Sequence, residues 1–248
     1  MGLPMMDFAV REIRATVKGT VAMLRLGSCG GLGDAEPGCL VVGSKGAVLV
    51  SRRPDLLHGK CASSGTNTIT SETAHPADAT PESPYGISRK PVMPDAELSA
   101  LYASKAREHL DEAGLKAIKV LQGVAATADG FYAPQGRVLR DFDDRCAGVV
   151  ERLELAHPEV LSLEMEHFAL LDIARSSRPA RRADGSEGPS VRAAVAAVPL
   201  VQRRTGKWAT AEHFEQMEVV VGKAALDALV TLDMPDAMPK EDILLPPQ

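Results

Sequence analysis

Short apolar runs alternate with stretches of helical periodicity along most of this chain, and this alternation restricts the fold more than any other feature. Runs of strand length lie at 21–26, 39–42, 47–50, 118–127, 160–163 and 193–201. Amphipathic helical patterns lie at 6–17, 94–114, 142–153, 167–174 and 214–228. Buried strands that alternate with such helices pack as layers, with helices on both faces of a sheet. We therefore predict an α/β fold, a three-layer α/β/α sandwich with a central mixed sheet.

The 248 residues contain neither an internal repeat nor a second core pattern, so one domain over 1–234 is predicted. Residues 52–93 are rich in Ser, Thr, Pro and Gly and predict a flexible insertion, either a solvated loop or a lid. Residues 175–190 predict a basic, flexible loop, and the proline-rich residues 235–248 a loose tail. The first helix carries one apolar stripe, Met6, Val10, Ile13 and Val17.

Composition argues against several classes of function. The net charge of −5 argues against a nucleic-acid partner or an anionic membrane surface. No apolar run approaches the ~20 residues that span a bilayer, and we expect a cytoplasmic protein. The four cysteines have no paired spacing and predict reduced thiols. The six histidines form neither HxH nor HExxH, so no metal site is expected.

The stretch 20–33 combines an arginine with a glycine-rich segment. Arg25 lies near the end of an apolar run that suits a strand buried on both faces, and a predicted glycine loop follows at 27–33. A buried arginine needs an anion or a carboxylate, and a glycine-rich turn lets backbone N–H groups approach an anion. Two interpretations stand level: an anion site at the carboxyl end of a strand, or a corner where Arg25 pairs with a neighbouring acid.

Two further clusters follow strand candidates. Glu164 and Glu166 flank Met165 between a strand and a helix. They are either first-turn acids favoured by the helix dipole or acceptors for two sugar hydroxyls, with Met165 as an apolar surface. Gln135 and Arg137 follow Phe131 in a turn-rich segment. They suit either the polar edge and the face of a planar heterocycle or an ordinary surface turn.

The order of these motifs resembles the nucleoside phosphorylase superfamily, of the uridine phosphorylase type. The motifs are Arg25-x-Gly-Ser, Phe131-Tyr-x-x-Gln-x-Arg137 and Glu164-Met-Glu. The opening Gly2-Leu-Pro is similar to that family's Gly-x-Gly-x-Pro turn. The resemblance extends from Gly2 to about Leu229 and is interrupted at 52–93 and 175–190. It implies a nucleoside phosphorylase-like fold.

The resemblance also implies roles for single residues. Arg25 and Ser28 would bind phosphate, and Glu166 would take the 2′- and 3′-hydroxyls of the ribose. The other implied substrate contacts are Phe131, Gln135 and Arg137 for uracil, and Glu164 and Met165 beside the ribose. Arg203 matches an arginine that supports the base pocket in pyrimidine-specific members. Its sequence context alone predicts an ordinary solvated charge. Arg25, Glu166 and Arg203 are the implied catalytic residues.

The implied activity is phosphorolysis of uridine to uracil and ribose 1-phosphate, a step of pyrimidine salvage. It needs inorganic phosphate as co-substrate and neither a metal nor an organic cofactor, and it implies a homo-oligomer, a dimer or larger. Purine-specific relatives place an aspartate where this chain has Pro199-Leu-Val-Gln-Arg203, so a pyrimidine is favoured. The alternatives are a purine-type phosphorylase or nucleosidase of the same fold, and a non-catalytic chain that binds nucleoside or a partner subunit.

The resemblance departs from the family before Gly2. Family members carry an additional N-terminal section with a Gly-Asp-x-x-Arg phosphate loop, which this sequence does not contain. From this we expect weak phosphate binding, little or no activity of this chain alone, and an exposed sheet edge or apolar face.

Overall fold

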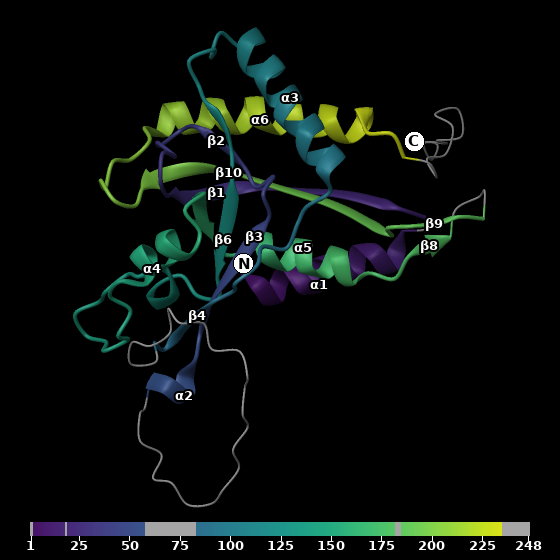
Figure 1. Ribbon diagram of the computed structural model, residues 1–248. Helices are drawn as coiled ribbons and strands as arrows, with labels where there is room; N and C mark the ends of the chain where they lie inside the picture. Colours follow the sequence, from purple (N-terminus) through teal and green to yellow (C-terminus); the bar gives the residue numbers. More distant parts are fainter. Residues whose placement is uncertain (1, 18, 58–82, 182–184, 235–248) are drawn as a thin grey trace, which may run out of the picture.

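The computed structural model describes residues 2–17, 19–57, 83–181 and 185–234, which form one mixed eight-stranded sheet with helices on both faces (Figure 1). The strand order is β4-β3-β6-β7-β1-β10-β2-β5. The strands are β1 (Val21–Gly31), β2 (Leu40–Val42), β3 (Ala47–Arg52), β4 (Tyr85–Ile87), β5 (Val120–Gln122), β6 (Val124–Ala128), β7 (Val160–Glu164) and β10 (Val191–Gln202). The helices are α1 (Leu3–Thr16), α2 (Pro54–Leu57), α3 (Ala96–Glu112), α4 (Val149–Ala156), α5 (His167–Ser176) and α6 (Ala211–Thr231).

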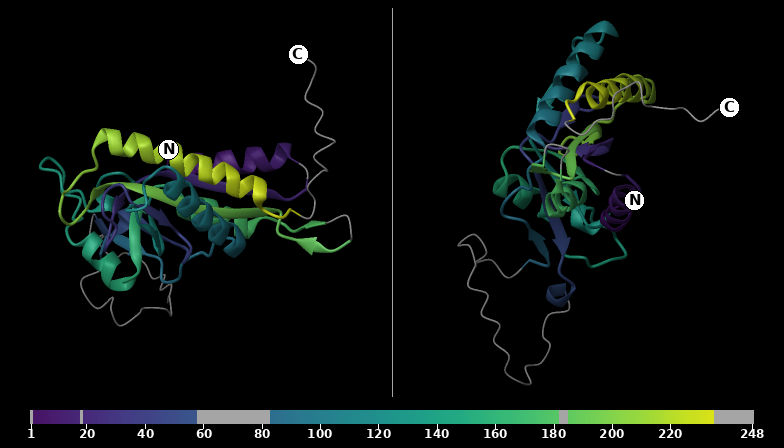
Figure 2. Two further views of the ribbon diagram at one scale, coloured as in Figure 1. Left: turned by 90° about the horizontal axis from the view of Figure 1, so that it is seen from above. Right: turned by 90° about the vertical axis from the view of Figure 1, so that its right-hand side faces the viewer.

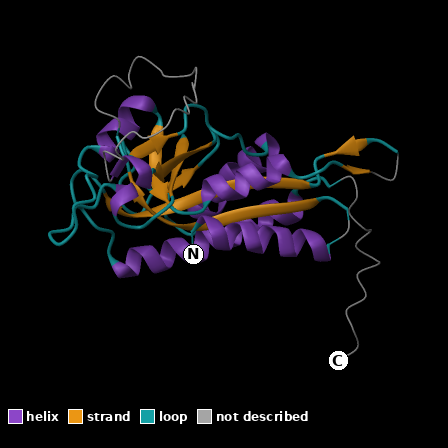
Figure 3. Ribbon diagram, turned by 90° about the horizontal axis from the view of Figure 1, so that it is seen from below, coloured by secondary structure: helices purple, strands orange, loops and turns teal. Residues whose placement is uncertain are grey.

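The helices form two layers around this sheet. Helices α3 and α6 pack on one another over β2 and β10, through a core that includes Tyr102, Val198 and Met217. Helices α1 and α5 cover the opposite face (Figures 2 and 3). Val10 and Leu171 pack there on the alternate strand residues. Because successive strand residues point to opposite faces, the alternation in the sequence supplies both cores. The predicted α/β/α sandwich is confirmed.

Strand β1 differs from the prediction at both of its ends. The predicted glycine loop is wrong, because residues 27–31 continue the strand and pair in parallel with β10. These glycines serve close packing: a Cβ on Gly31 would lie 2.2 Å from the carbonyl oxygen of Ala35. The predicted burial on both faces is also wrong, since the first seven residues of β1 are only half-buried. Strand β7 pairs with β1 only at Gly30 and Gly31. Within the described residues, the β1 residues before Gly30 therefore have no strand partner on the side of β7.

Two predicted elements are longer than the elements in the structure. The run 118–127 contains two strands in different parts of the sheet, because β5 pairs with β2 whereas β6 lies between β3 and β7. The chain changes position at Gly123, where a Cβ would lie 2.6 Å from a methyl group of Leu161. The predicted helix 142–153 begins only at Val149, after Gly148 at φ 75°, and Phe142 is exposed.

The two predicted flexible segments contain regular structure. Within 52–93, β4 pairs with β3, and the buried Tyr85 donates a hydrogen bond to the carbonyl of Asp144, so this part belongs to the sheet. Residues 58–82 of the predicted insertion and the tail 235–248 lie outside the described residues. Within 175–190, β8 (Ala180–Arg181) and β9 (Glu187–Gly188) form an antiparallel pair, which corrects the loop prediction.

The apolar stripe predicted on the first helix is only partly buried. Met6 and Val10 lie in the core, whereas Ile13 and Val17 are exposed, together with Phe8. Three of the cysteines, Cys29, Cys39 and Cys146, are buried free thiols. The helices of the described residues include none with the length and hydropathy of a membrane span.

Candidate functional site

Strand β1 runs through two polar clusters that contain most of the predicted site residues. The Arg25 cluster consists of Arg25, Glu164, Glu166 and His167. The Arg137 cluster consists of Phe131, Gln135, Arg137 and Arg203. Arg25 belongs to the first half of β1, and the backbone of Gly30 in the second half packs against the Arg203 side chain. Ser28 lies between them on the same strand and is exposed.

Arg25 is held from several sides. Its Nη1 lies 3.1 Å from Oε2 of Glu164 and 2.9 Å from Nε2 of His167, and its Nη2 donates to Oε2 of Glu166. The guanidinium folds over Gly27, where a Cβ would lie 2.8 Å from Cζ of Arg25. With its side chain 17% exposed, Arg25 is largely buried and compensated by two carboxylates. The pairing with neighbouring acids that the sequence left open is present in the structure, and the anion site stays a prediction.

Glu164 closes strand β7 and accepts hydrogen bonds from several directions. The hydroxyl of Thr127 donates to Oε1, and the backbone N–H groups of Glu166 (2.6 Å) and His167 (3.0 Å) donate to the carboxylate. Burial nevertheless raises the pKa of Glu164 to about 7, because Arg25 and these donors offset the desolvation only in part. Glu164 therefore anchors the start of α5 and one side of Arg25.

Glu166 bridges two parts of the chain that are far apart in sequence. Its Oε1 accepts a hydrogen bond of 2.7 Å from the backbone N–H of Gly2, and its Oε2 contacts Arg25. Burial alone raises the pKa of Glu166, but the Gly2 N–H and the charge of Arg25 outweigh it and hold the pKa below its usual value. Met165 lies beside this contact, since a Cβ on Gly2 would be 3.5 Å from the Met165 methyl group.

His167 completes the Arg25 cluster and was missed in the sequence analysis. It is the first residue of α5, is 1% exposed, and its Nε2 lies 3.2 Å from the carbonyl oxygen of Ala196 in β10. Its Nδ1 is buried, and no residue in the described ranges forms a hydrogen bond with it. Burial, and then the positive charge of Arg25, lower its pKa well below the usual value, so the imidazole is neutral. A histidine directly after Glu166 was the only signal, and a lone buried histidine has no characteristic spacing.

The Arg137 cluster is formed by the segment after β6. The guanidinium carbon of Arg137 lies 4.4 Å from the centre of the Phe131 ring, which suits a cation–π contact. A short 3₁₀ helix, η2 (Ala133–Gln135), ends at Gly136 in the left-handed region and buries Gln135. Nε of Arg137 is buried and has no hydrogen-bond partner within the described part of the chain, and burial lowers the pKa of this arginine. Phe131 itself is half-exposed.

Arg203 joins this cluster from the end of β10. Its Nη2 donates a 2.6 Å hydrogen bond to the backbone carbonyl of Gln135, and its backbone N–H donates to Gly31. Burial, and next the positive charge of Arg137, lower the pKa of Arg203. Neither guanidinium forms an ion pair with any residue in the described ranges. Two partly buried guanidiniums therefore lie close together, and no carboxylate of the described residues pairs with either.

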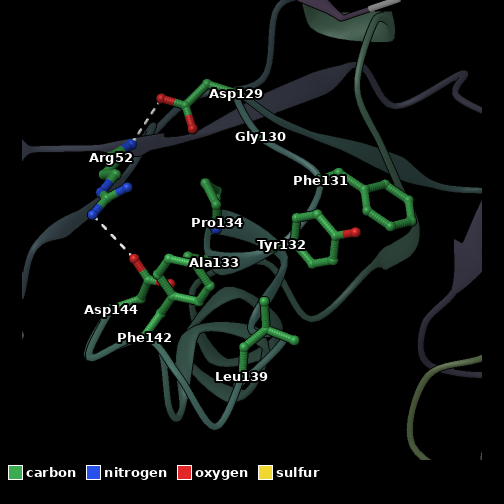
Figure 4. Close-up of a pocket in the computed structure, with 10 residues that line it drawn as sticks. All are labelled: Arg52, Asp129, Gly130, Phe131, Tyr132, Ala133, Pro134, Leu139, Phe142 and Asp144. Atoms are coloured by element: carbon green, nitrogen blue, oxygen red, sulfur yellow. Dashed lines mark hydrogen bonds and ion pairs between the residues drawn. The ribbon is translucent and has the colours of Figure 1, made fainter.

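A cavity of about 610 Å³ lies on another part of the 129–137 segment (Figure 4). Arg52 pairs with Asp144 at 3.0 Å there, and its backbone N–H donates to Asp129. The ring of Phe131 lies on the side of this cavity away from Arg52 (Figure 4). The lining includes neither Arg137 nor any member of the Arg25 cluster, so the predicted site residues do not gather in this cavity. Within the described residues no group of three or more His, Cys, Asp or Glu could hold a metal ion.

Comparison with known proteins identifies the family. A family model described as the phosphorylase superfamily matches residues 1–178, so this chain belongs to the phosphorylase superfamily. A uridine phosphorylase of the oomycete Phytophthora capsici is 31% identical, with a TM-score of 0.78, and the match covers 94% of this chain and 75% of that chain. The structural neighbours of this protein are thus uridine phosphorylases.

More distant structures share the fold. A Trypanosoma brucei nucleoside phosphorylase that shows uridine phosphorylase activity is 19% identical, with a TM-score of 0.64, over 94% of this chain and 78% of that one. Isoform 2 of the Schistosoma mansoni uridine phosphorylase, in complex with citrate, is 17% identical with a TM-score of 0.56, over 93% and 68%. The comparison with curated proteins finds no match.

Proposed function

We propose that this phosphorylase cleaves uridine with inorganic phosphate and releases uracil and ribose 1-phosphate. The observation that carries the proposal is the pair of partly buried guanidiniums, Arg137 and Arg203, beside Gln135. When the glycosidic bond breaks, its electron pair stays with uracil, and the negative charge spreads over N3 and the carbonyl oxygens. Two cations without a carboxylate and one amide match such a planar anion, because preorganised donors favour the charge that develops.

A pyrimidine fits this cluster better than a purine. A purine leaving group is helped by an acid that protonates the base, and residues 199–203 contain no acid. The side chain at the corresponding position is Arg203, which donates to the carbonyl of Gln135. The 31% identical relative is described as a uridine phosphorylase, which supports the same substrate.

The Arg25 cluster supplies the other half of the proposed reaction. Arg25 and Ser28 bind phosphate, and Glu166 accepts hydrogen bonds from the ribose hydroxyls while Met165 packs against the sugar. One phosphate oxygen forms a bond to C1′ as the C1′–N1 bond breaks through an oxocarbenium-like transition state. Arg25 aligns the phosphate for this attack, and alignment of two reactants lowers the barrier. Glu164 holds Arg25 in place through the 3.1 Å ion pair.

The direct test measures uracil release from uridine with and without inorganic phosphate. We expect release to depend on phosphate, and the variants R137M and R203M to lose about 10²–10³-fold in rate, the usual loss for one preorganised donor. R140M is the matched control, because Arg140 is an exposed arginine of the same segment. It should keep the wild-type rate.

Other outcomes of this assay would assign a different function. Preferential cleavage of inosine or methylthioadenosine would indicate a purine-type enzyme, and uracil release without phosphate would indicate a nucleosidase. Calorimetric binding of uracil without turnover of any nucleoside would indicate a non-catalytic nucleoside-binding chain.

A further inference from the structure

We propose that His167 is a positioning residue that fixes the Arg25 guanidinium for an inorganic phosphate ligand by accepting a hydrogen bond from it as a neutral imidazole. This inference rests on the proposed function, in which Arg25 binds phosphate. His167 lies behind Arg25 at the start of α5, with Nε2 2.9 Å from Nη1 of Arg25. The same nitrogen also lies 3.2 Å from the carbonyl oxygen of Ala196 in β10, so a donor and an acceptor compete for it.

The shorter of the two Nε2 contacts, with a charged donor, selects which ring nitrogen carries the proton. A guanidinium can only donate, so at 2.9 Å Nε2 must offer its lone pair to Arg25. The proton then lies on Nδ1, which is 3.8 Å from Oε1 of Glu164 and has no hydrogen-bond partner among the described residues. In this tautomer the Nδ1–H dipole points toward Glu164 and the Nε2 lone pair toward a cation. Both contacts are attractive, and in this inference they outweigh the repulsion between that lone pair and the Ala196 carbonyl oxygen at 3.2 Å. In the opposite tautomer the Nε2–H group would donate to the carbonyl of Ala196. It would also face an Nη1–H group of Arg25, so two donors would point at one another.

A neutral acceptor fixes the guanidinium of Arg25 without adding negative charge, which a third carboxylate would do. Arg25 already contacts Glu164 and Glu166, and their charges offset its own. His167 occupies a further Nη1 hydrogen without adding negative charge, so the guanidinium is fixed while it stays attractive to an anion. The charged groups around the imidazole are Arg25 from β1, Glu164 from β7 and Glu166 at the start of α5. The group that fixes Arg25 can therefore be removed without changing the charge of the cluster.

A matched pair of variants tests the acceptor. In H167Q the amide oxygen reaches the place of Nε2, whereas in H167N the shorter amide reaches only the place of Nδ1. We expect H167N to weaken the binding of radiolabelled inorganic phosphate in equilibrium dialysis about tenfold, which is the value of one hydrogen bond to a charged group. H167Q should stay within about threefold of wild type, and the binding of uracil should be unchanged in both.

The tautomer supplies a readout that does not depend on activity. Nitrogen NMR of the ¹⁵N-labelled wild-type protein, assigned by the signal that disappears in H167Q, should show His167 as the Nδ1–H tautomer at pH 8, where Glu164 is ionised, and as a neutral imidazole at pH 6. An Nε2–H tautomer at pH 8 or an imidazolium at pH 6 overturns the inference. Equal phosphate binding in H167N, H167Q and wild type also overturns it, as does equal weakening in both variants.

The outcomes separate this inference from the proposed function. A wild-type chain that binds phosphate, shows the Nδ1–H tautomer and loses phosphate affinity only in H167N, yet turns over no nucleoside, supports the role of His167 and contradicts the proposed activity. A chain that phosphorolyses uridine with the same phosphate KM in H167N as in wild type retains the activity and overturns the inference. A wild-type chain that binds no phosphate in dialysis also overturns it.

Discussion

The two clusters along β1 differ in whether carboxylates of the protein compensate the charge of the buried arginines. Arg25 is surrounded by two carboxylates and a neutral histidine, so its charge is compensated within the protein. Arg137 and Arg203 are partly buried beside one another, and in the described part of the chain no acid pairs with either. A compensated cluster contributes to the fold, whereas an uncompensated one lowers stability until an anion arrives. In the proposed function, Arg25 is therefore fixed by groups of the protein before phosphate binds, whereas Arg137 and Arg203 obtain a counter-charge only from the departing uracil.

The largest effect expected from this comparison is on stability. R25M should lower the free energy of unfolding by about 3–5 kcal/mol, because it leaves Glu164 and Glu166 buried without their cation. R137M should leave it unchanged or raise it by about 1 kcal/mol, because an unpaired buried charge is removed. Urea unfolding at pH 8 measures both.

R11M is the control for the loss of an arginine that pairs on the surface. Arg11 contacts Asp7 in an exposed pair, so its removal should change stability by about 0–1 kcal/mol. Equal destabilisation by R25M and R137M would show that the two clusters do not differ in compensation.

The second prediction concerns pH and the Arg25 cluster. The pKa of Glu164 is raised to about 7 in the folded protein, so between its ordinary value and pH 7 the folded state binds more protons than the unfolded state. The contribution of Glu164 to stability is therefore fully present at low pH and is lost as the pH rises through about 7. In E164Q this dependence is absent, and Glu166 and His167 remain in both proteins.

Thermal unfolding at pH 5, 6, 7 and 8 measures this effect. The Tm of wild type minus that of E164Q should fall by a few °C, on the order expected for one shifted carboxylate, as the pH rises. E151Q removes an exposed carboxylate and should show a constant difference from wild type. A difference between wild type and E164Q that grows with pH would contradict the assigned shift.

The third prediction concerns the glycines that contact each cluster. G27A places a Cβ 2.8 Å from Cζ of Arg25, and G30A places one 2.7 Å from Cδ of Arg203. Each should cost about 1–3 kcal/mol through overpacking. G27A should weaken phosphate binding and G30A the binding of uracil, measured by dialysis and calorimetry.

G222A is the control for both glycine variants. Gly222 lies inside α6 with open space around its Cα, so alanine there should raise stability by about 0.5–1 kcal/mol. If G27A and G30A weaken both ligands equally, the two clusters are not separate binding sites.

Much of the layered fold followed from local patterns. Asp95 caps α3 by accepting from the N–H of Leu98, and Gly114 lies after its end at φ 75°. Such signals are local, because a cap or an apolar stripe acts within one or two turns of its own helix. The division of the run 118–127 at Gly123 was not predictable, because it depends on Leu161, which approaches Gly123 only in the folded sheet.

The candidate site also contains some residues that the sequence predicted and others that it did not. The motifs around Glu164 and Gln135 were recognisable because their spacing is short and each follows a strand. The partners of Arg25 were left open between an anion and an acid, because Glu164 and Glu166 are about 140 residues away along the chain. His167 was not found, since nothing in its spacing distinguishes a buried acceptor from an ordinary core histidine.

The sequence by itself determined the alternation of strands and helices, the acidic pair between β7 and α5 and the absence of an acid at 199–203. These features depend on residue type and on near neighbours. Only the tertiary structure decided that the glycines 27–31 continue a strand, and that Arg25 is compensated while Arg137 and Arg203 are not. Compensation depends on distance in space, and the charges that meet here come from strands and loops that are remote in sequence.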